Sequence, residues 1–321
     1  MTRLRRTNWA GPGIHRVRAG RGFTYRDAHG ATIDDPVLLE RIASLVIPPA
    51  WTDVWIAPYP NGHIQAVGVD AAGRRQYLYH PAWREHEDRL KFARSLALSE
   101  SLPAARRQVT MDLRAEGLPR ERVLAAGFRM LDTGSLRVGT ERYAAEHGSI
   151  GLTTLLCAHA TVTGDDVELQ FPAKSGHAWE STIHDADLAV VVRRLRRRGP
   201  TARLLSFKDD RGWHPVSPAE INEYVRERTH GDFTAKDFRT LHGTVAAAIS
   251  LAKSDATTRK ARERAVAQAM RDASAVLENT PAVARSSYVD PRVIDLFMRG
   301  QTIDRERLGA AETELRALLF D

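Results

Sequence analysis

A single cysteine, Cys157, occurs among the 321 residues. No intrachain disulfide and no cluster of thiolate metal ligands can therefore form, which fits a reducing cellular interior. Long hydrophobic runs are missing as well: the most apolar stretch, residues 245–252, is far shorter than the roughly 20 residues of a membrane-spanning helix. The charged N-terminus is followed by no apolar segment, so we expect no secretory signal. We expect a cytoplasmic protein with no membrane partner.

Several motifs of nucleotide and metal chemistry are also missing. The sequence has no Gly-x-x-x-x-Gly-Lys-Ser/Thr loop for ATP phosphates and no His-Glu-x-x-His pair for zinc. Acidic residues are scattered, without the clustered carboxylates that hold two magnesium ions. Cys157 and His159 lack further ligands nearby, and we expect them in a strand of the core. We therefore expect no metal and no cofactor, so any phosphate chemistry must rely on the protein's own cations.

Basic residues exceed acidic ones by 47 to 40, which gives a net charge of +7, and the pI is near 9.8. Most of them are arginines, whose planar guanidinium groups bind phosphate through two hydrogen bonds. This balance favours a polyanionic partner such as nucleic acid, although an ordinary basic enzyme has the same composition. A hydrophobic content of 43% over this length is enough for two domains with a sizeable core.

Residues 1–84 predict a small antiparallel sheet with one or two helices. Apolar or alternating segments at 22–27, 54–57, 64–69 and 76–79 indicate strands separated by turns. Residues 36–46 have the spacing of a short helix. Alternation puts Tyr77 and Tyr79 on one face, where they either cover a core or lie on nucleic acid.

Residues 85–321 predict a larger, mainly helical domain with a small sheet, so the fold class is α+β. The segment 81–84 reads as the joint between the domains. Helical spacing is clearest at 120–132, where one apolar stripe ends at Gly134. We also expect helices at 85–98, 103–116, 185–198, 217–229, 234–253, 256–276 and 304–319, and strands at 154–163, 167–171 and 177–183.

Tyr288 stands just before a predicted helix start. Asp290 is expected as the N-cap and Pro291 at the first helical position, followed by an apolar face with Val293 and Phe297. A tyrosine at such a place either packs on a neighbouring helix or acts as a covalent nucleophile. Its ordinary pKa is about 10, so the second role requires cations nearby.

Short motifs in a defined order connect this tyrosine with the rest of the chain, and together they make the chain resemble the type IB DNA topoisomerases, specifically their compact poxvirus-like bacterial group. The resemblance covers nearly the whole chain. Its motifs are Ile-Pro-Pro-Ala-Trp at 47–51, Val-Trp-Ile at 54–56, Gly-His-Ile-Gln-Ala at 62–66, Arg-Arg-Gln-Tyr-Leu-Tyr-His-Pro at 74–81, Leu-Arg-Val-Gly at 136–139, Gly-Leu-Thr-Thr-Leu at 151–155, Phe-Pro-Ala-Lys-Ser-Gly at 171–176, Asp-Phe-Arg-Thr at 237–240, Asn-Thr-Pro-Ala-Val at 279–283 and Ser-Tyr at 287–288.

The resemblance implies a fold of the tyrosine recombinase and topoisomerase IB type and a catalytic set. Tyr288 would attack a backbone phosphate and form a 3′-phosphotyrosyl bond. Arg137 and Arg239 would bind the non-bridging oxygens, and Lys174 would protonate the leaving 5′ oxygen. Asn279 stands where most of the family has histidine; an amide can donate a hydrogen bond but cannot carry a proton. On the DNA side, Gln76, Tyr77 and Tyr79 would face the groove and Tyr143 would contact phosphate.

Two other interpretations share parts of this pattern. A tyrosine recombinase uses a similar set of cations and a tyrosine, but Lys236 occupies a position where recombinases usually have histidine. A non-catalytic DNA-binding protein of the same fold would not need the four cationic and nucleophilic positions. The resemblance therefore implies a nucleoid-associated monomer that forms a clamp around double-stranded DNA and relaxes supercoils of both signs without ATP or metal.

Overall fold

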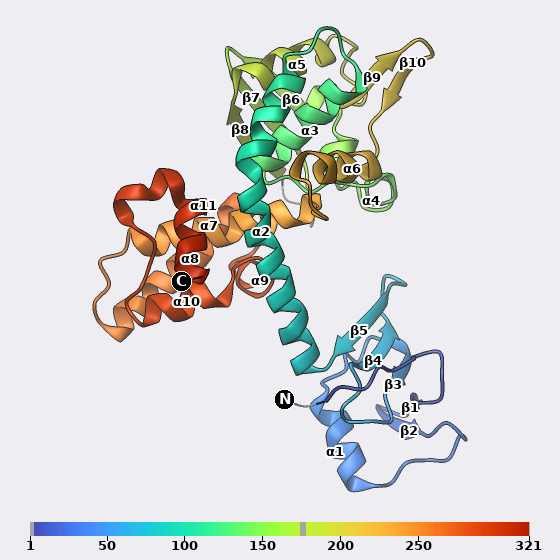
Figure 1. Cartoon of the computed structure of the whole chain (residues 1–321). Coiled ribbons are helices and arrows are strands. Elements are labelled where there is room, and N and C mark those ends of the chain that lie inside the picture. Colours follow the sequence, from blue (N-terminus) through green and yellow to red (C-terminus); the bar gives the residue numbers. More distant parts are fainter. Residues whose placement is uncertain (1–2, 174–177, 321) are drawn as a thin grey trace. The chain divides into compact units, whose positions relative to one another are not determined.

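The computed structural model describes residues 3–173 and 178–320, and it divides into two compact units, Met1–Leu90 and Lys91–Asp321 (Figure 1). The first unit is built on an antiparallel sheet, and the second is mainly helical with two small sheets. The predicted α+β class is confirmed. No helix in the described part of the chain is long and apolar enough to span a membrane.

The first unit contains a five-stranded sheet in the order β2-β1-β3-β4-β5 and one helix. The helix and four of the strands lie where the sequence predicts them. Strand β1 is not predicted, because its alternating arginines hide the pattern and only its first residue is buried. The elements are β1 (Ile14–Ala19), β2 (Gly22–Arg26), α1 (Pro36–Ser44), β3 (Thr52–Ile56), β4 (Ile64–Val69) and β5 (Arg75–Tyr79).

The two faces of this sheet have different surroundings. One face packs under α1, with Ile42 of the helix against Val54 and Ile56 of β3. The opposite face carries Trp55, Ala57, Ile64 and Val67, on which Trp9 and Tyr77 pack. Alternation along each strand produces this division.

Helix α2 (Pro81–Leu113) begins within the predicted joint and corrects one prediction. The segment 81–84 is the first turn of this helix, with Pro81 at its start, a position that suits proline. The helix is continuous through Pro103, where the sequence predicts a break between two helices. An internal proline costs about 3 kcal/mol. Burial of Leu98, Leu102 and Val109 on the same helix offsets that cost.

The second unit contains two hydrophobic clusters, and α7 (Ala235–Ala252) contributes to both. Its first half, with Phe238 and Leu241, packs in one cluster, and its second half, with Ala247 and Leu251, packs in the other. Its start is fixed because the Asp237 carboxylate accepts a hydrogen bond from the Thr234 N–H at 2.7 Å. The helix therefore passes through the middle of the unit with its first turns held in place.

The predicted strand at 154–163 begins only at Ala160, since Leu152–Thr154 and Cys157–His159 form short 3-10 turns. Cys157 is buried as expected, but in a turn. Helix α9 and the β9–β10 hairpin are not predicted, and the helix expected at 304–319 is a 3-10 turn (Arg305–Ala310) followed by α11. The remaining elements are α3 (Arg120–Gly134), α4 (Glu141–His147), β6 (Ala160–Thr163), β7 (Asp166–Pro172), β8 (Ala178–His184), α5 (Ala186–Arg196), β9 (Ser206–Asp209), β10 (Gly212–Pro215), α6 (Pro218–Thr229), α8 (Arg259–Leu277), α9 (Pro281–Ser287), α10 (Pro291–Met298) and α11 (Ala311–Phe320).

Candidate functional site

Tyr288 lies in the short connection between α9 and α10. The predicted N-cap is confirmed: the Asp290 side chain accepts a hydrogen bond from the Arg292 N–H at 2.9 Å, and Pro291 begins α10. Helix α9 ends at Tyr288, whose N–H donates to the Ala284 carbonyl at 3.0 Å. The ends of two helices therefore fix the backbone on both sides of the tyrosine.

Two residues of α7 hold this backbone from a third direction. The Thr244 hydroxyl accepts a hydrogen bond from the Asp290 N–H at 3.1 Å, and it lies 3.0 Å from the Tyr288 carbonyl oxygen as a donor. Gly243 allows the close approach, because a Cβ there would lie 3.0 Å from the Tyr288 Cβ and 2.9 Å from Leu277 Cδ1. A larger residue at position 243 would push the tyrosine away from α7.

Arg239 lies on the same helix and is only 2% exposed. Its Nη1 donates to the Ser135 carbonyl and its Nη2 to the Leu277 carbonyl, the latter at 2.7 Å. These carbonyls stand at the C-terminal ends of α3 and α8, where the helix dipole favours a cation. The Arg239 Cζ is 5.2 Å from the centroid of the Tyr288 ring. The structure thus brings Arg239 close to Tyr288, two residues that the resemblance places in one catalytic set.

Arg137 follows two residues after Ser135 and is half-buried. Its Nη2 donates to the Glu278 carbonyl at 3.3 Å. Its backbone is anchored because the Arg137 carbonyl accepts from the Leu152 N–H at 2.8 Å. Within residues 3–173 and 178–320, neither Arg137 nor Arg239 has a carboxylate in ion-pair distance. The two cations are held by backbone carbonyls and remain electrically available to an anion.

The electrostatics around Tyr288 follow from this arrangement. Burial alone would raise the pKa of its hydroxyl, but Arg239, Arg137 and Lys236 together lower that pKa below its usual value. Burial, and next the repulsion from Arg137, lowers the pKa of Arg239 to about 10. A group of cations without nearby carboxylates stabilises both a phenolate and a bound phosphate.

Asn279 directly follows Glu278, the left-handed cap of α8 whose carbonyl binds Arg137. Its Nδ2 and Oδ1 are buried and have no hydrogen-bond partner in the described part of the chain. A buried amide left unpaired costs about 1–3 kcal/mol, so its persistence calls for an explanation. A ligand that accepts a hydrogen bond beside the two arginines would supply one.

The other predicted positions differ in what the structure records. Lys174 falls among residues 174–177, outside the described residues. Tyr143 lies on α4, where its side chain is 41% exposed and its N–H donates to Thr140 Oγ1 at 3.3 Å.

On the sheet of the first unit, Tyr77 and Tyr79 share a face as predicted. Their rings stack with centroids 6.1 Å apart and planes at 18°. Gln76 points to the opposite face by strand alternation, and its Nε2 donates to Asp70 Oδ2 at 2.8 Å. The tyrosine pair and Gln76 therefore do not form a single row.

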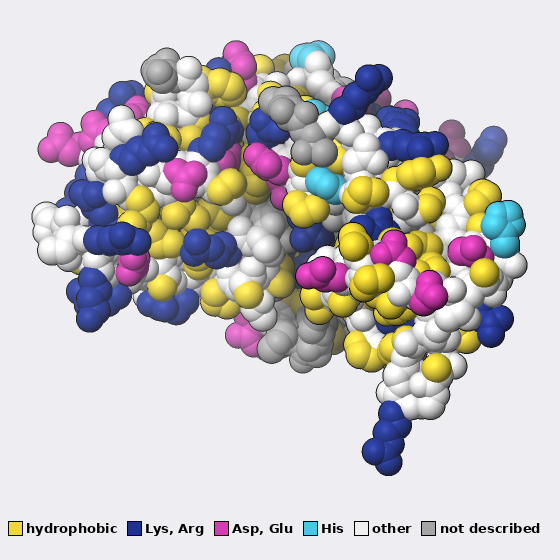
Figure 2. Space-filling model, turned by 90° about the horizontal axis from the view of Figure 1, so that it is seen from below, with side chains coloured by type: hydrophobic (Ala, Val, Ile, Leu, Met, Phe, Trp, Pro, Cys, Tyr) yellow, Lys and Arg dark blue, Asp and Glu magenta, His cyan; other side chains and the backbone are white. Residues whose placement is uncertain are grey.

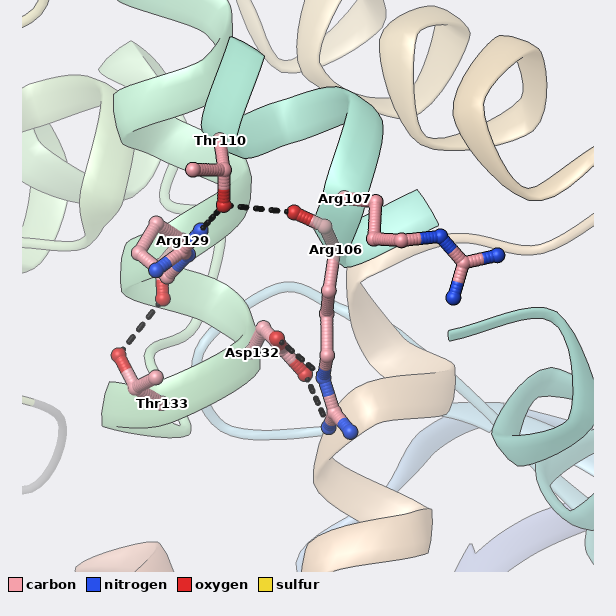
Figure 3. Close-up of a pocket in the computed structure, with 6 residues that line it drawn as sticks. All are labelled: Arg106, Arg107, Thr110, Arg129, Asp132 and Thr133. Carbon is pink, nitrogen blue, oxygen red and sulfur yellow. Dashed lines mark hydrogen bonds and ion pairs between the residues drawn. The ribbon is translucent and has the colours of Figure 1, made fainter. Parts of the chain in front are cut away.

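A cavity of about 350 Å³ in the second unit is lined by arginines of a different kind (Figure 3). Arg106 binds both oxygens of Asp132, each at 2.8 Å, and also pairs with Glu312 of α11. Arg129 donates to Thr110 at 2.7 Å and pairs with Asp185. Carboxylates neutralise Arg106 and Arg129, so these residues form a structural ion-pair network beside the cavity. The network supports the end of α3 that leads to Ser135 and Arg137.

The distribution of surface charge does not by itself mark a binding site. Figure 2 shows Lys and Arg side chains spread over the visible face and interspersed with acidic and hydrophobic ones, rather than gathered in one patch. No group of three or more potential metal-ligating side chains occurs among the described residues. The arrangement that distinguishes the molecule is therefore the cationic environment of Tyr288.

Ser135, Gly243 and Thr244 are functional-site residues that the sequence does not predict. For Gly243 a signal exists, because a glycine inside a helix costs about 1 kcal/mol relative to alanine and indicates a close approach. Ser135 adopts a left-handed conformation with φ of +53°, and its hydroxyl contacts His242 Nδ1 at 2.7 Å. No local pattern announces the contacts of Ser135 and Thr244, which join segments distant in the chain.

Two protein families match the chain. Residues 80–300 match the family described as eukaryotic DNA topoisomerase I, catalytic core, and residues 22–70 match the bacterial DNA topoisomerase IB N-terminal domain. A DNA topoisomerase 1B of Acanthamoeba polyphaga mimivirus is 30% identical over 297 residues, covering 89% of this chain and 87% of that protein. A DNA topoisomerase I of monkeypox virus is 20% identical over 298 residues, which are 89% of this chain and 90% of its own. A DNA topoisomerase 1 of Mycosarcoma maydis is 24% identical over 212 residues, 60% of this chain but only 20% of that longer protein.

Proposed function

Since the chain belongs to the type IB DNA topoisomerases, enzymes that nick and religate DNA, we propose that it relaxes positive and negative supercoils in duplex DNA without ATP or metal. One observation supports this proposal above all. The Tyr288 ring centroid lies 5.2 Å from the Cζ of Arg239, a buried arginine that no described carboxylate neutralises. The alternatives are a recombinase-like strand transferase and a DNA-binding protein without catalysis.

The reaction exchanges one phosphodiester for another. The Tyr288 hydroxyl loses its proton and its oxygen attacks the phosphorus, and the bond to the 5′ oxygen of the next nucleotide breaks. The leaving oxygen takes a proton from Lys174, acting as general acid. The 3′-phosphotyrosyl bond stores the energy of the broken one, so the 5′ hydroxyl can attack in turn and reseal the strand. While the strand is open, torque rotates the free end.

Arg239 and Arg137 bind the non-bridging oxygens, whose charge grows in the transition state. Their hydrogen bonds to the carbonyls of Ser135, Leu277 and Glu278 hold them in place before DNA binds. Preorganised cations of this kind commonly contribute about 10²–10³ in rate each. Asn279 donates its Nδ2–H to the same phosphate, which pairs a buried amide that has no hydrogen-bond partner among the described residues.

Duplex DNA is bound by the first unit as well. Tyr77 and Tyr79 contact it through their shared face, Gln76 contacts it from the opposite face of the same edge strand, β5, and Tyr143 of the second unit contacts phosphate. The enzyme acts as a monomer whose two units together clamp the duplex, in the cytoplasm and on the nucleoid.

The test is relaxation of positively and negatively supercoiled plasmid in EDTA without ATP, with the parent protein and Tyr288→Phe. We expect the parent to relax both substrates, the variant to relax neither, and a covalent adduct to form on the 3′ side of the nick. An adduct with strand exchange but no relaxation would favour the recombinase. Absence of any adduct would leave only DNA binding.

A further inference from the structure

The N-terminal strap, residues 3–11, is attached to the first unit although it lies outside both family matches. The Arg5 N–H donates to the Asn61 carbonyl and the Arg5 carbonyl accepts from the His63 N–H, both at 2.9 Å. Further along, Trp55 Nε1 donates to the Gly11 carbonyl at 3.1 Å. The strap therefore lies on the sheet face opposite α1, the face that carries Tyr77.

Two arginines on this side lie over aromatic rings. The Arg5 Cζ is 3.7 Å from the centroid of the Tyr59 ring, and the Arg75 Cζ is 3.9 Å from that of Trp9. Trp9 packs on the same hydrophobic cluster as Tyr77. Both arginines are exposed, and neither has a carboxylate partner among the residues that the structure describes.

A third arginine over an aromatic ring, Arg16, differs from Arg5 and Arg75 in the hydrogen bonds of its guanidinium group. Arg16 lies 4.1 Å from the Phe23 ring, but it donates to the carbonyls of Ile47, Pro48 and Trp51. Its hydrogen-bonding capacity is used within the fold. Arg5 and Arg75 are stacked in the same way, while no hydrogen bond from their guanidinium groups is found in the described part of the chain.

A guanidinium held against a ring is well suited to phosphate. Stacking restricts the side chain before binding, so less conformational entropy is lost, and the N–H edge stays open for two parallel hydrogen bonds. A hollow of about 560 Å³ beside the strap adds further donors, with Arg5, Arg6, Asn8 and His29 on its wall. Asp27 also lines it, but its Oδ1 accepts the N–H groups of His29 and Ala31.

We propose that the strap and β5 form a phosphate-binding surface for duplex DNA, on which Arg5 and Arg75 contact backbone phosphates and Trp9 positions Arg75. The inference rests on the proposed function in that its ligand is duplex DNA. It adds a contact surface that begins before the family matches do.

The experiment measures duplex binding against salt concentration with the full chain carrying Tyr288→Phe, which prevents covalent trapping. Each lost phosphate contact should reduce the slope of log K against log salt by about 0.9 and the affinity near 0.1 M salt by about 5- to 10-fold. We expect this for Arg5→Gln and for Arg75→Gln. Arg18→Gln is the matched control, because Arg18 is an exposed arginine on β1 whose side chain points to the α1 face; it should leave slope and affinity unchanged.

Trp9 is tested as a positioning residue by a double-mutant cycle. Trp9→Ala should weaken binding in the parent but add nothing to Arg75→Gln, while Trp9→Phe should retain most of the affinity. Equal losses in Arg5→Gln, Arg75→Gln and Arg18→Gln would overturn the proposal, because net charge alone would then explain them, and so would no loss in any of them. Additive effects of Trp9→Ala and Arg75→Gln would overturn the role of Trp9. If the parent does not bind duplex at all, the proposed function itself fails.

Discussion

Arg106 and Arg239 both lie in packed regions of the second unit, but their pKa values shift in opposite directions. Burial alone would lower the pKa of Arg106, but its hydrogen bonds to Asp132 and Glu312 raise it above its usual value. Arg239 meets two carbonyls, the Tyr288 ring and the repulsion of Arg137 but no carboxylate among the described residues, and burial with that repulsion lowers its pKa to about 10. The first cation is neutralised by the fold, whereas the second keeps a charge that the fold does not balance.

This difference separates a structural ion-pair network from a site for an anion. Both arginines occupy crowded surroundings, and a basic composition alone does not distinguish them. What distinguishes them is the partner, since a carboxylate satisfies the charge while a carbonyl satisfies only the hydrogen bond.

The largest effect is expected when arginine is replaced by glutamine at position 239, and the same replacement at position 106 serves as the comparison. Arg239→Gln should slow single-turnover strand cleavage by about 10²–10³, because a preorganised transition-state contact is lost. Arg106→Gln should leave the cleavage rate of the folded protein within a few-fold of the parent. It should instead lower the free energy of unfolding by about 2–3 kcal/mol, because the buried Asp132 loses its partner.

Single-turnover cleavage of a duplex substrate and urea denaturation measure the two quantities separately. A large rate loss in folded Arg106→Gln, or an Arg239→Gln protein that merely unfolds more easily, would contradict the division between the two arginines.

A smaller effect is expected for the contact between α7 and the tyrosine. Thr244→Val keeps the shape but removes the hydroxyl that binds the Asp290 N–H, so the Tyr288 backbone loses one of its anchors. We expect about a 10-fold loss in cleavage rate with unchanged duplex affinity. Thr240→Val, one turn earlier on α7, is the control because, in the described part of the chain, the Thr240 hydroxyl donates only to the Lys236 carbonyl, at 3.4 Å. Rescue by Thr244→Ser would confirm that the hydroxyl is responsible.

The lowered pKa of Tyr288 predicts a pH effect of definite sign. Burial opposes ionisation, but the cations Arg239, Arg137 and Lys236 outweigh it. Between this lowered pKa and about 10, the folded protein binds fewer protons than the unfolded chain, so this group adds stability as the pH rises and loses its contribution as the pH falls through the folded value. Difference absorbance titration of the parent against Tyr288→Phe should show a phenolate below the ordinary range. Lys236→Gln should move that titration to higher pH; movement to lower pH would refute the assignment.

The smallest effect is expected in the stability of Asn279→Ala. Most substitutions of buried residues lower the free energy of unfolding, but this one should not. Asn279→Ala removes a buried amide that has no partner in the described residues, so it should leave the free energy of unfolding unchanged or raise it by up to about 1 kcal/mol. Cleavage should nevertheless slow, because the phosphate loses a donor. Asn279→His, the residue common in the family, should preserve cleavage. A clear loss of stability in Asn279→Ala would mean that the amide has a structural role.

Local patterns account for much of the fold. The cap at Asp290, the stripe of α3 and the pairing of Tyr77 with Tyr79 follow from signals within a few residues, and all three are confirmed. The prediction fails where distant packing outweighs a local signal. Pro103 marks a helix end by itself, yet the surrounding leucines are buried in one cluster and keep α2 continuous.

The amino-acid sequence alone shows which groups are present, in which order and beside which helix ends: a tyrosine before a capped helix, two arginines earlier in the chain, and an amide where the resemblance implies histidine in most of the family. What each group touches depends on tertiary packing. Arg239 meets the carbonyls of Ser135 and Leu277, which are 104 and 38 positions away in the chain. Such contacts depend on the packing of whole helices, and the cost of burying an unneutralised cation is offset by that packing as a whole rather than by its neighbours in sequence.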